Sequence, residues 1–139
     1  MTITGRCLCG RVAYEYEGVV GPANYSHCED CRRCTGSAYN IGVRLALADL
    51  RISSGEPKSF TKRGDSGREL TRHFCGDCGS PLYTSAPLHP EHVYVRAGSL
   101  DDPSVVEPMH QSWVGSAVAW SRIAPTLRAF VRGSGGGVR

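Results

Sequence analysis

The sequence lacks the features that would place the chain in a membrane, in the secretory pathway or on a nucleic acid. No segment approaches the roughly 18 consecutive apolar residues of a membrane span. The N-terminus combines no basic start with an apolar run, so no secretory signal is visible. Basic residues occur singly, and the net charge is only +3, which argues against a nucleic-acid surface.

These absences predict a cytoplasmic protein that interacts with neither membranes nor nucleic acids. The cytoplasm is reducing, and disulfides are disfavoured there. The chain of 139 residues nevertheless contains seven cysteines. An odd number also argues against a fully paired disulfide framework, so these cysteines need another explanation.

No composition shift or internal repeat divides the chain. We expect one zinc-binding β domain over residues 1–132 and a flexible Gly-rich tail over 133–139. Short alternating apolar patterns, separated by Gly and Pro, predict an all-β fold rather than βαβ units. The clearest predicted strands lie in residues 11–18, 39–47, 68–74 and 92–98.

Two local patterns are specific enough to test. In residues 11–18, Val12, Tyr14 and Tyr16 share one face, as a half-buried strand requires. The one persuasive helix runs from about residue 28 to 35, with acidic residues in its first turn and Gly36 after it.

Two pairs of closely spaced cysteines lie far apart in the sequence. They are Cys7 with Cys9, and Cys75 with Cys78, and a turn glycine follows each pair. This spacing predicts a four-thiolate zinc site, whose closed tetrahedron leaves no position for a substrate. Such a site would clamp two loops together and stabilise a small β domain. The alternative is four unrelated buried cysteines.

A third cluster lies in "SHCEDCRRCTG", residues 26–36, which contains Cys28, Cys31 and Cys34. These three cysteines are metal ligands, a redox pair with a bystander, or small buried side chains. No thioredoxin-like βαβ pattern surrounds them, which weakens the interpretation as a dithiol redox protein.

Five motifs occur in the order typical of one family. They are "GRCLCGRVAYEYEG", "HCEDCRRCTGSAY", "SGEPKSF", "RHFCGDCGSPLY" and "EPMHQSWVGSAVAW". Over roughly residues 3 to 130 the chain resembles the glutathione-dependent formaldehyde-activating enzyme family, which also includes centromere protein V. The resemblance implies a mostly antiparallel β-tent fold with one short helix and a zinc-clamped pair of Cys loops. The structural zinc would be bound by the same Cys7, Cys9, Cys75 and Cys78.

The family's enzymes hold a second zinc in a C-x-C-x-x-C stretch, and here this chain departs from the family. The second and third ligands map onto Cys28 and Cys31, but the first maps onto Ser26. A neutral hydroxyl is a far poorer zinc ligand than a thiolate.

Three interpretations of Cys28 and Cys31 therefore remain open. They hold a weak zinc ion that substrate completes, they act as a thiol pair without metal, or they are simply buried. In the second case Cys28, near a helix N-terminus, has a lowered pKa and is a plausible nucleophile. Cys34 is assigned to packing.

The resemblance implies a carbon–sulfur lyase that acts on adducts of glutathione, or a similar small thiol, with formaldehyde or another small carbonyl compound. Cys28 and Cys31 are then the catalytic residues. The alternative is a non-catalytic structural-zinc domain for binding or scaffolding, which Ser26 favours; the sequence leaves enzymatic activity and oligomeric state open. Candidate partners for glutathione's carboxylates are Arg32, Arg33, Arg44 and Arg96, and candidate pocket walls are Tyr39, Tyr83, Trp113 and Trp120.

Overall fold

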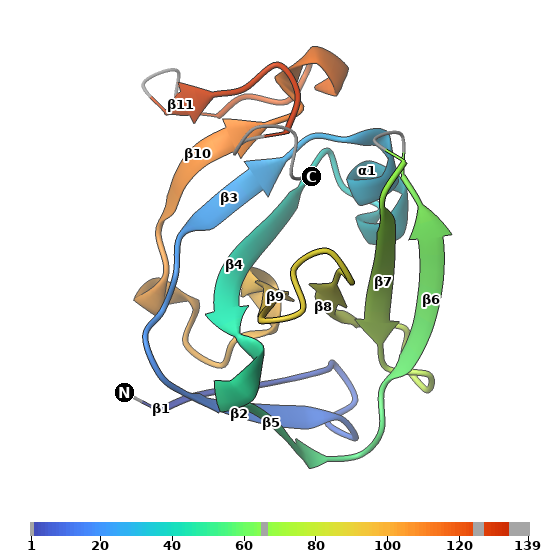
Figure 1. Cartoon of the computed structure of the whole chain (residues 1–139), viewed down its shortest axis with the longest axis vertical. Coiled ribbons are helices and arrows are strands. Elements are labelled where there is room, and N and C mark those ends of the chain that lie inside the picture. The colour runs from blue at the N-terminus through green and yellow to red at the C-terminus, as the bar shows by residue number, and fades with distance from the viewer. Residues whose placement is uncertain (1, 65–66, 124–126, 134–139) are drawn as a thin grey trace.

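The computed structural model describes residues 2–64, 67–123 and 127–133, which form two β-sheets and one α-helix (Figure 1). The strands are β1 (Thr2–Arg6), β2 (Ala13–Glu17), β3 (Ala23–Ser26), β4 (Asn40–Ala46), β5 (Leu50–Ser54), β6 (Lys58–Arg63), β7 (Glu69–Phe74), β8 (Pro81–Ser85), β9 (His92–Arg96), β10 (Pro108–Ser112) and β11 (Arg128–Ala129). The helix is α1 (Glu29–Thr35), and short 3₁₀ helices span Leu47–Asp49, Ala97–Ser99, Pro103–Val105 and Val114–Ser116. The prediction of an all-β fold with one short helix is confirmed.

The two sheets differ in size and in strand direction. The smaller sheet has the order β1-β2-β5 and is antiparallel throughout. The larger sheet has the order β11-β10-β3-β4-β9-β8-β7-β6. Within it, β10 runs parallel to both β3 and β11, and the remaining described pairs are antiparallel. The expected antiparallel pairing therefore holds everywhere except at β10.

The small sheet lies across one end of the large sheet, and the core fills the space between them (Figure 1). Val12, Tyr14 and Tyr16 are only 1–2% exposed, so the predicted inward face of β2 is confirmed. The Tyr14 hydroxyl lies 2.6 Å from Ser99 Oγ, and the Tyr16 hydroxyl donates to the Val19 carbonyl at 2.6 Å. These bonds satisfy the polar ends of two buried rings, as burial of a tyrosine requires.

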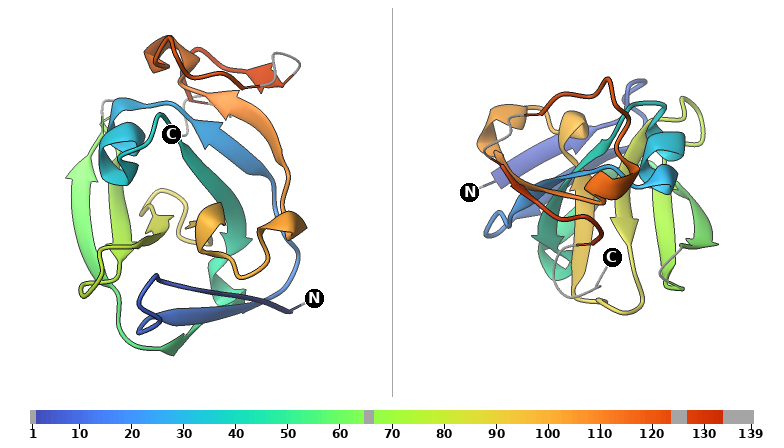
Figure 2. Two further views of the ribbon diagram at one scale, coloured as in Figure 1. Left: turned by 180° about the vertical axis from the view of Figure 1, so that it is seen from behind. Right: turned by 90° about the horizontal axis from the view of Figure 1, so that it is seen from above.

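The large sheet contributes the opposite side of this core. Its buried side chains come mainly from β4, β8 and β9, namely Val43, Leu45, Leu82, Val93 and Val95. The segments with the third cysteine cluster lie at the other end of these strands, beside α1 (Figures 1 and 2). A packed core thus separates the small sheet from the helix region and holds the strand ends next to α1 in place.

Helix α1 begins and ends where the sequence indicates. Cys28 is its N-cap, and the Cys28 thiol accepts a hydrogen bond from the Cys31 amide at 3.2 Å. Glu29 and Asp30 occupy the first turn. Gly36 has a φ of 70°, and its N–H donates to the Arg32 carbonyl at 2.9 Å, which closes the helix.

Two further expectations concern the limits of the domain. The single domain over residues 1–132 stays a prediction, and the predicted tail over 133–139 lies outside the described residues except for Gly133. Within the described ranges, no helix combines the length and apolarity that crossing a bilayer requires.

Candidate metal centre and thiol pocket

Two loops that are distant in sequence bring four thiols together. Cys7 and Cys9 follow β1, and Cys75 and Cys78 follow β7. Their four Sγ atoms all lie within 4.8 Å of one another, with 3.6 Å between Cys7 and Cys9 and 3.8 Å between Cys9 and Cys75. A tetrahedron with metal–sulfur bonds of about 2.3 Å has edges of about 3.8 Å. The arrangement can therefore hold one metal ion, and it is the one such group of three or more ligands among the described residues.

Hydrogen-bond donors surround these sulfur atoms. The Val12 amide donates to Cys7 Sγ at 3.3 Å, and the Asp77 amide donates to Cys75 Sγ at 3.4 Å. Ser80 joins the two loops, because its Oγ accepts from the Leu8 amide at 3.0 Å and lies 3.2 Å from Cys78 Sγ. Donors of this kind stabilise negative charge on sulfur and orient the ligands of a metal.

Two glycines allow the loops to turn around the cluster. Gly10 has a φ of 80° and Gly79 has a φ of 78°, conformations that L side chains rarely adopt. The Gly10 amide donates to the Cys7 carbonyl at 3.2 Å, and the Gly79 amide donates to the Cys75 carbonyl at 2.8 Å. Each loop is thus a tight turn that points its sulfur atoms inward.

The electrostatics of the cluster favour a bound cation. The Ser80 hydroxyl, with backbone donors, lowers the pKa of Cys78 to about 5. The Arg11 amide lowers the pKa of Cys9, but desolvation and the neighbouring thiols outweigh it and raise that pKa to about 11. Like charges this close disfavour one another, so all four sulfurs ionise together only when a positive ion lies between them.

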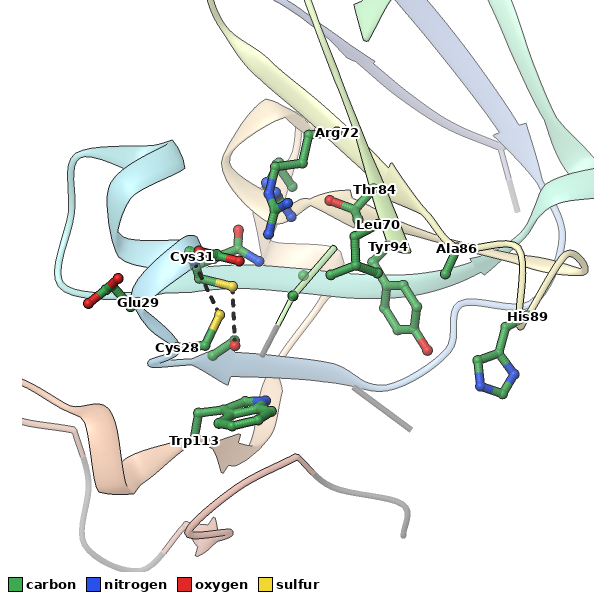
Figure 3. A pocket seen from close by; sticks show the side chains of 16 residues that line it. Cys28, Glu29, Cys31, Leu70, Arg72, Thr84, Ala86, His89, Tyr94 and Trp113 are labelled. Atoms are coloured by element: carbon green, nitrogen blue, oxygen red, sulfur yellow. Dashed lines mark hydrogen bonds between the residues drawn. The ribbon is translucent and has the colours of Figure 1, made fainter. Parts of the chain in front are cut away.

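The second cysteine region lies where β3 meets α1. The Cys31 thiol donates to Ser26 Oγ at 3.3 Å, and the Cys31 amide donates to Cys28 Sγ at 3.2 Å (Figure 3). Ser26 is 1% exposed, and Cys31 is buried beside it. The three positions of the C-x-C-x-x-C pattern therefore converge, but they carry only two thiols.

The two thiols of this region differ in charge. The neighbouring Cys31 side chain, with smaller contributions from the Cys31 amide and Ser26, outweighs burial and lowers the pKa of Cys28 to about 6. The Cys28 side chain and burial raise the pKa of Cys31 well above its ordinary value. At pH 7 the pair therefore carries one negative charge, centred on Cys28.

The second cluster offers one thiolate ligand fewer than the C-x-C-x-x-C pattern supplies. A catalytic zinc site usually has three protein ligands, and here the third position is a neutral hydroxyl that already accepts a hydrogen bond from Cys31. Cys34 does not replace it, because Cys34 is exposed and its thiol is directed to the Cys31 carbonyl at 3.5 Å. Because Cys34 is exposed, its assignment to packing is wrong. A second zinc on Cys28 and Cys31 stays a prediction.

Cys28 and Cys31 open into a pocket between α1 and the large sheet (Figure 3). Arg72 extends into it from β7, and Trp113 lies on the other side of the cysteine pair in this view. Further residues that line the pocket include Asn40 and Gly42 of β4, Thr84 of β8, and Tyr94 and Arg96 of β9.

The structure brings one of the four predicted arginines to this pocket. Arg96 lines it and is 7% exposed. Arg32 and Arg33 pair with Glu29 on the helix surface at 3.9 and 3.6 Å. Arg44 is exposed on β4 and does not line the pocket.

Sequence reasoning missed Arg72. Its position in the strand was the available signal, because Leu70, Arg72 and Phe74 alternate onto one face of β7. Leu70 and Arg72 both line the pocket.

Of the four aromatic residues predicted as pocket walls, one lines the pocket. Trp113 lines the pocket, and it is the one described non-glycine residue with a positive φ, at 58°. Trp120 is 73% exposed. Tyr83 stacks on His73 with 4.2 Å between ring centroids, and Tyr39 packs edge-on against Tyr25 at 5.1 Å.

Fold and site together define an all-β protein with a four-thiol cluster that can hold a metal ion and a separate thiol-containing pocket. A sequence model of the family described as glutathione-dependent formaldehyde-activating enzyme matches residues 2–116, and the chain belongs to this family. A Halomonas elongata protein that carries the name of a glutathione-dependent formaldehyde-activating enzyme is 30% identical over 119 residues, 79% of this chain and 74% of that protein.

The fold also matches a solved structure. A crystal structure of a Rhodobacter sphaeroides protein superposes with a TM-score of 0.60 and 21% sequence identity, covering 91% of this chain and 98% of that one. This similarity supports the all-β fold described above.

Proposed function

We propose that the protein is a carbon–sulfur lyase that forms and cleaves the adduct of a small thiol, such as glutathione, with formaldehyde. One observation in the structure carries the proposal: the Cys28–Cys31 pair opens into a pocket that also contains the buried Arg96. Membership of the family supports formaldehyde and glutathione as the reactants.

We infer that the four-cysteine cluster holds zinc and that this zinc is structural. Four thiolates in a tetrahedron suit zinc and leave no open position for a substrate. Cys7, Cys9, Cys75 and Cys78 would hold the ion. Bound there, zinc would neutralise the thiolates and tie the turn after β1 to the turn after β7.

The thiol pair supplies a proton acceptor for the reaction. In the direction of adduct formation, the Cys28 thiolate takes the proton of the glutathione thiol. The new glutathione thiolate attacks the formaldehyde carbon, and the electron pair of the C=O π bond moves to oxygen. That oxygen takes the proton back from Cys28, which yields S-hydroxymethylglutathione and restores the Cys28 thiolate. The reverse sequence cleaves the carbon–sulfur bond.

The pKa of Cys28 suits this role. An acid–base group works best when its pKa lies near the operating pH, and the pKa of Cys28 is lowered to about 6. Cys31 stays protonated and acts as a positioning residue, because its amide donates to Cys28 Sγ at 3.2 Å and its side chain lowers the pKa of Cys28.

A second candidate function is a non-catalytic domain stabilised by zinc. Ser26 favours it, since a serine at the first position of the C-x-C-x-x-C pattern removes a thiolate that a second zinc would need. In this case the pocket retains its shape but not its chemistry.

Exchange measurements separate the two functions. Formaldehyde and glutathione form their adduct spontaneously, so an enzyme accelerates the exchange between free and bound formaldehyde, which NMR magnetisation transfer detects. We expect acceleration by the wild type and a loss of about 100-fold or more in Cys28→Ser, the range that general acid–base groups contribute. Arg51→Met is the control, because Arg51 lies on β5 away from the pocket and pairs with Glu15. A wild type no faster than buffer would exclude the lyase and favour the non-catalytic domain.

A further inference from the structure

Two arginines in the pocket lack a carboxylate partner among the described residues. Arg96 is 7% exposed, and its Nη2 donates a long hydrogen bond to Cys34 Sγ at 3.8 Å. The Nε atoms of Arg72 and Arg96 are buried and have no hydrogen-bond partner among the described residues. Within the same residues, no carboxylate oxygen lies within 4.0 Å of either guanidinium. Buried charges without partners are costly, so this arrangement needs an explanation.

The two cations also act on each other. Burial lowers the pKa of Arg96, Cys34 and Cys31 oppose this by raising it, and the charge of Arg72 makes a smaller contribution that lowers it. The guanidinium of Arg96 acts in turn on Cys31, where its charge favours the thiolate form. Arg72, Arg96 and the thiol pair therefore share one electrostatic environment in the pocket.

The acidic residues of the pocket do not neutralise this charge. Asp30 pairs with Lys62 at 2.6 Å, and Glu29 pairs with two arginines of its own helix. Thr84, in contrast, is 7% exposed, lines the same pocket, and its hydroxyl has no partner among the described residues. Two cations and one unpartnered hydroxyl thus face a cavity whose carboxylates are paired elsewhere, and among the described residues neither guanidinium donates a hydrogen bond to the Cys28 thiolate.

We infer that Arg72, Arg96 and Thr84 form a subsite for a carboxylate group of the substrate. A carboxylate accepts hydrogen bonds from a guanidinium fork and from a hydroxyl, and it offsets the charges of the buried Arg96 and the half-buried Arg72. The inference rests on the proposed function, because it takes this carboxylate to belong to the reacting thiol. It narrows the substrate class to thiols that carry an acid group near the sulfur.

Binding of glutathione and its diethyl ester tests the subsite without turnover. Titration calorimetry on the reduced, zinc-loaded full chain, without formaldehyde, compares the two. The ester lacks both negative charges but keeps the thiol and the peptide. We expect glutathione to bind the wild type at least about tenfold more tightly than the ester, since hydrogen bonds to charged groups contribute about 1.5–3 kcal/mol.

The Arg96→Met substitution should reduce the affinity for glutathione to that for the ester, and it should leave the affinity for the ester unchanged. Its ligand-free melting temperature should equal or exceed that of the wild type, because a buried unpaired cation is replaced by an apolar side chain of similar length. Arg72→Met serves as a second variant should Arg96→Met fold poorly. Arg51→Met is the matched control, because Arg51 lies on β5 away from the pocket and pairs with Glu15.

Equal binding of glutathione and its ester would overturn the subsite, as would a variant that weakens both alike. Inorganic phosphate binding as tightly as glutathione would overturn the assignment to a substrate carboxylate, because a free anion would then suffice. Arg96-dependent binding of glutathione without accelerated exchange would exclude the lyase and retain the subsite. Equal exchange rates with glutathione and the ester would retain the lyase and exclude the subsite.

Discussion

The four-cysteine cluster joins residues from two tight turns, whereas the Ser26–Cys28–Cys31 cluster joins the end of β3 to the start of α1. In the first, four sulfurs lie within 4.8 Å of one another. In the second, the backbone brings three positions together just as closely, with 3.3 Å between Cys31 Sγ and Ser26 Oγ. The first set can hold a metal ion by itself, whereas the second has one oxygen where the pattern places sulfur.

The comparison separates two properties of a metal-binding motif, namely the convergence of its positions and their affinity for the metal. Convergence of the positions is a property of the backbone, and it survives the replacement of cysteine by serine because the two side chains are similar in size. Affinity for the metal is a property of the donor atoms, and we expect it to fall on this replacement, because a neutral hydroxyl lacks the charge of a thiolate.

The largest expected effect is loss of the fold on breaking the four-thiol site. Cys75→Ser, or complete removal of zinc by a chelator, should unfold the protein. Zinc binding contributes about 10–16 kcal/mol to the folding of small zinc domains. The net free energy of unfolding of a typical protein is only about 5–15 kcal/mol, so loss of the zinc should unfold the chain. Circular dichroism measures the loss of the fold, and zinc analysis on the same samples measures the loss of the metal. Cys34→Ser, at an exposed cysteine, is the control and should melt as the wild type does. An unchanged melting temperature after complete chelation would contradict the structural role.

The next effect concerns the incomplete cluster. Ser26→Cys places a third thiolate beside Cys28 and Cys31, so zinc content should rise from about one to about two ions per chain. Circular dichroism should stay the same, because the buried position already lies 3.3 Å from Cys31 Sγ. Metal analysis of both proteins decides the matter. A wild type with two ions would show that Ser26 is not limiting, and a variant with one would show that the cluster no longer binds metal.

A smaller effect distinguishes the thiols of the pocket. Because the pKa of Cys28 is lowered to about 6, its alkylation by iodoacetamide should reach half its maximal rate near pH 6. Mass spectrometry of the modified peptide measures the rate from pH 5 to 9, with Cys31→Ser as a comparison. Removing Cys31 removes the main cause of the lowered pKa, so the midpoint should move upward. A midpoint near pH 9 in the wild type would contradict the charged pair.

The same lowered pKa has a consequence for stability. The ionised Cys28 stabilises the folded state above the pKa of the unfolded thiol, about 9. This contribution should decrease as the pH falls through the folded value of about 6.

The smallest effect is expected at the tip of the first Cys loop. Leu8 lies between two predicted ligands, yet its side chain is 86% exposed. Leu8→Ser should change the free energy of unfolding by less than about 0.5 kcal/mol, as surface substitutions usually do. Zinc content should also stay unchanged. Loss of zinc would show that this side chain helps to close the site.

Local patterns predicted the helix and the strands well. Alternation in residues 11–18 identified the inward face of β2, and acidic residues before a glycine located α1. The pattern did not identify Arg72 as a pocket residue, because alternation assigns a residue to one face of a strand but does not say which faces border a cavity. The exposure of Cys34 likewise depends on what packs against its side of α1.

The sequence by itself determined the two cysteine pairs, the missing ligand at Ser26 and the all-β pattern, since each depends on residue identity and short-range spacing. Only the tertiary structure decided that Arg72 from β7 and Arg96 from β9 enter the pocket that holds Cys28 and Cys31. The physical reason is that strand order and register place residues far apart in the chain beside one another, and no local pattern encodes which strands become neighbours.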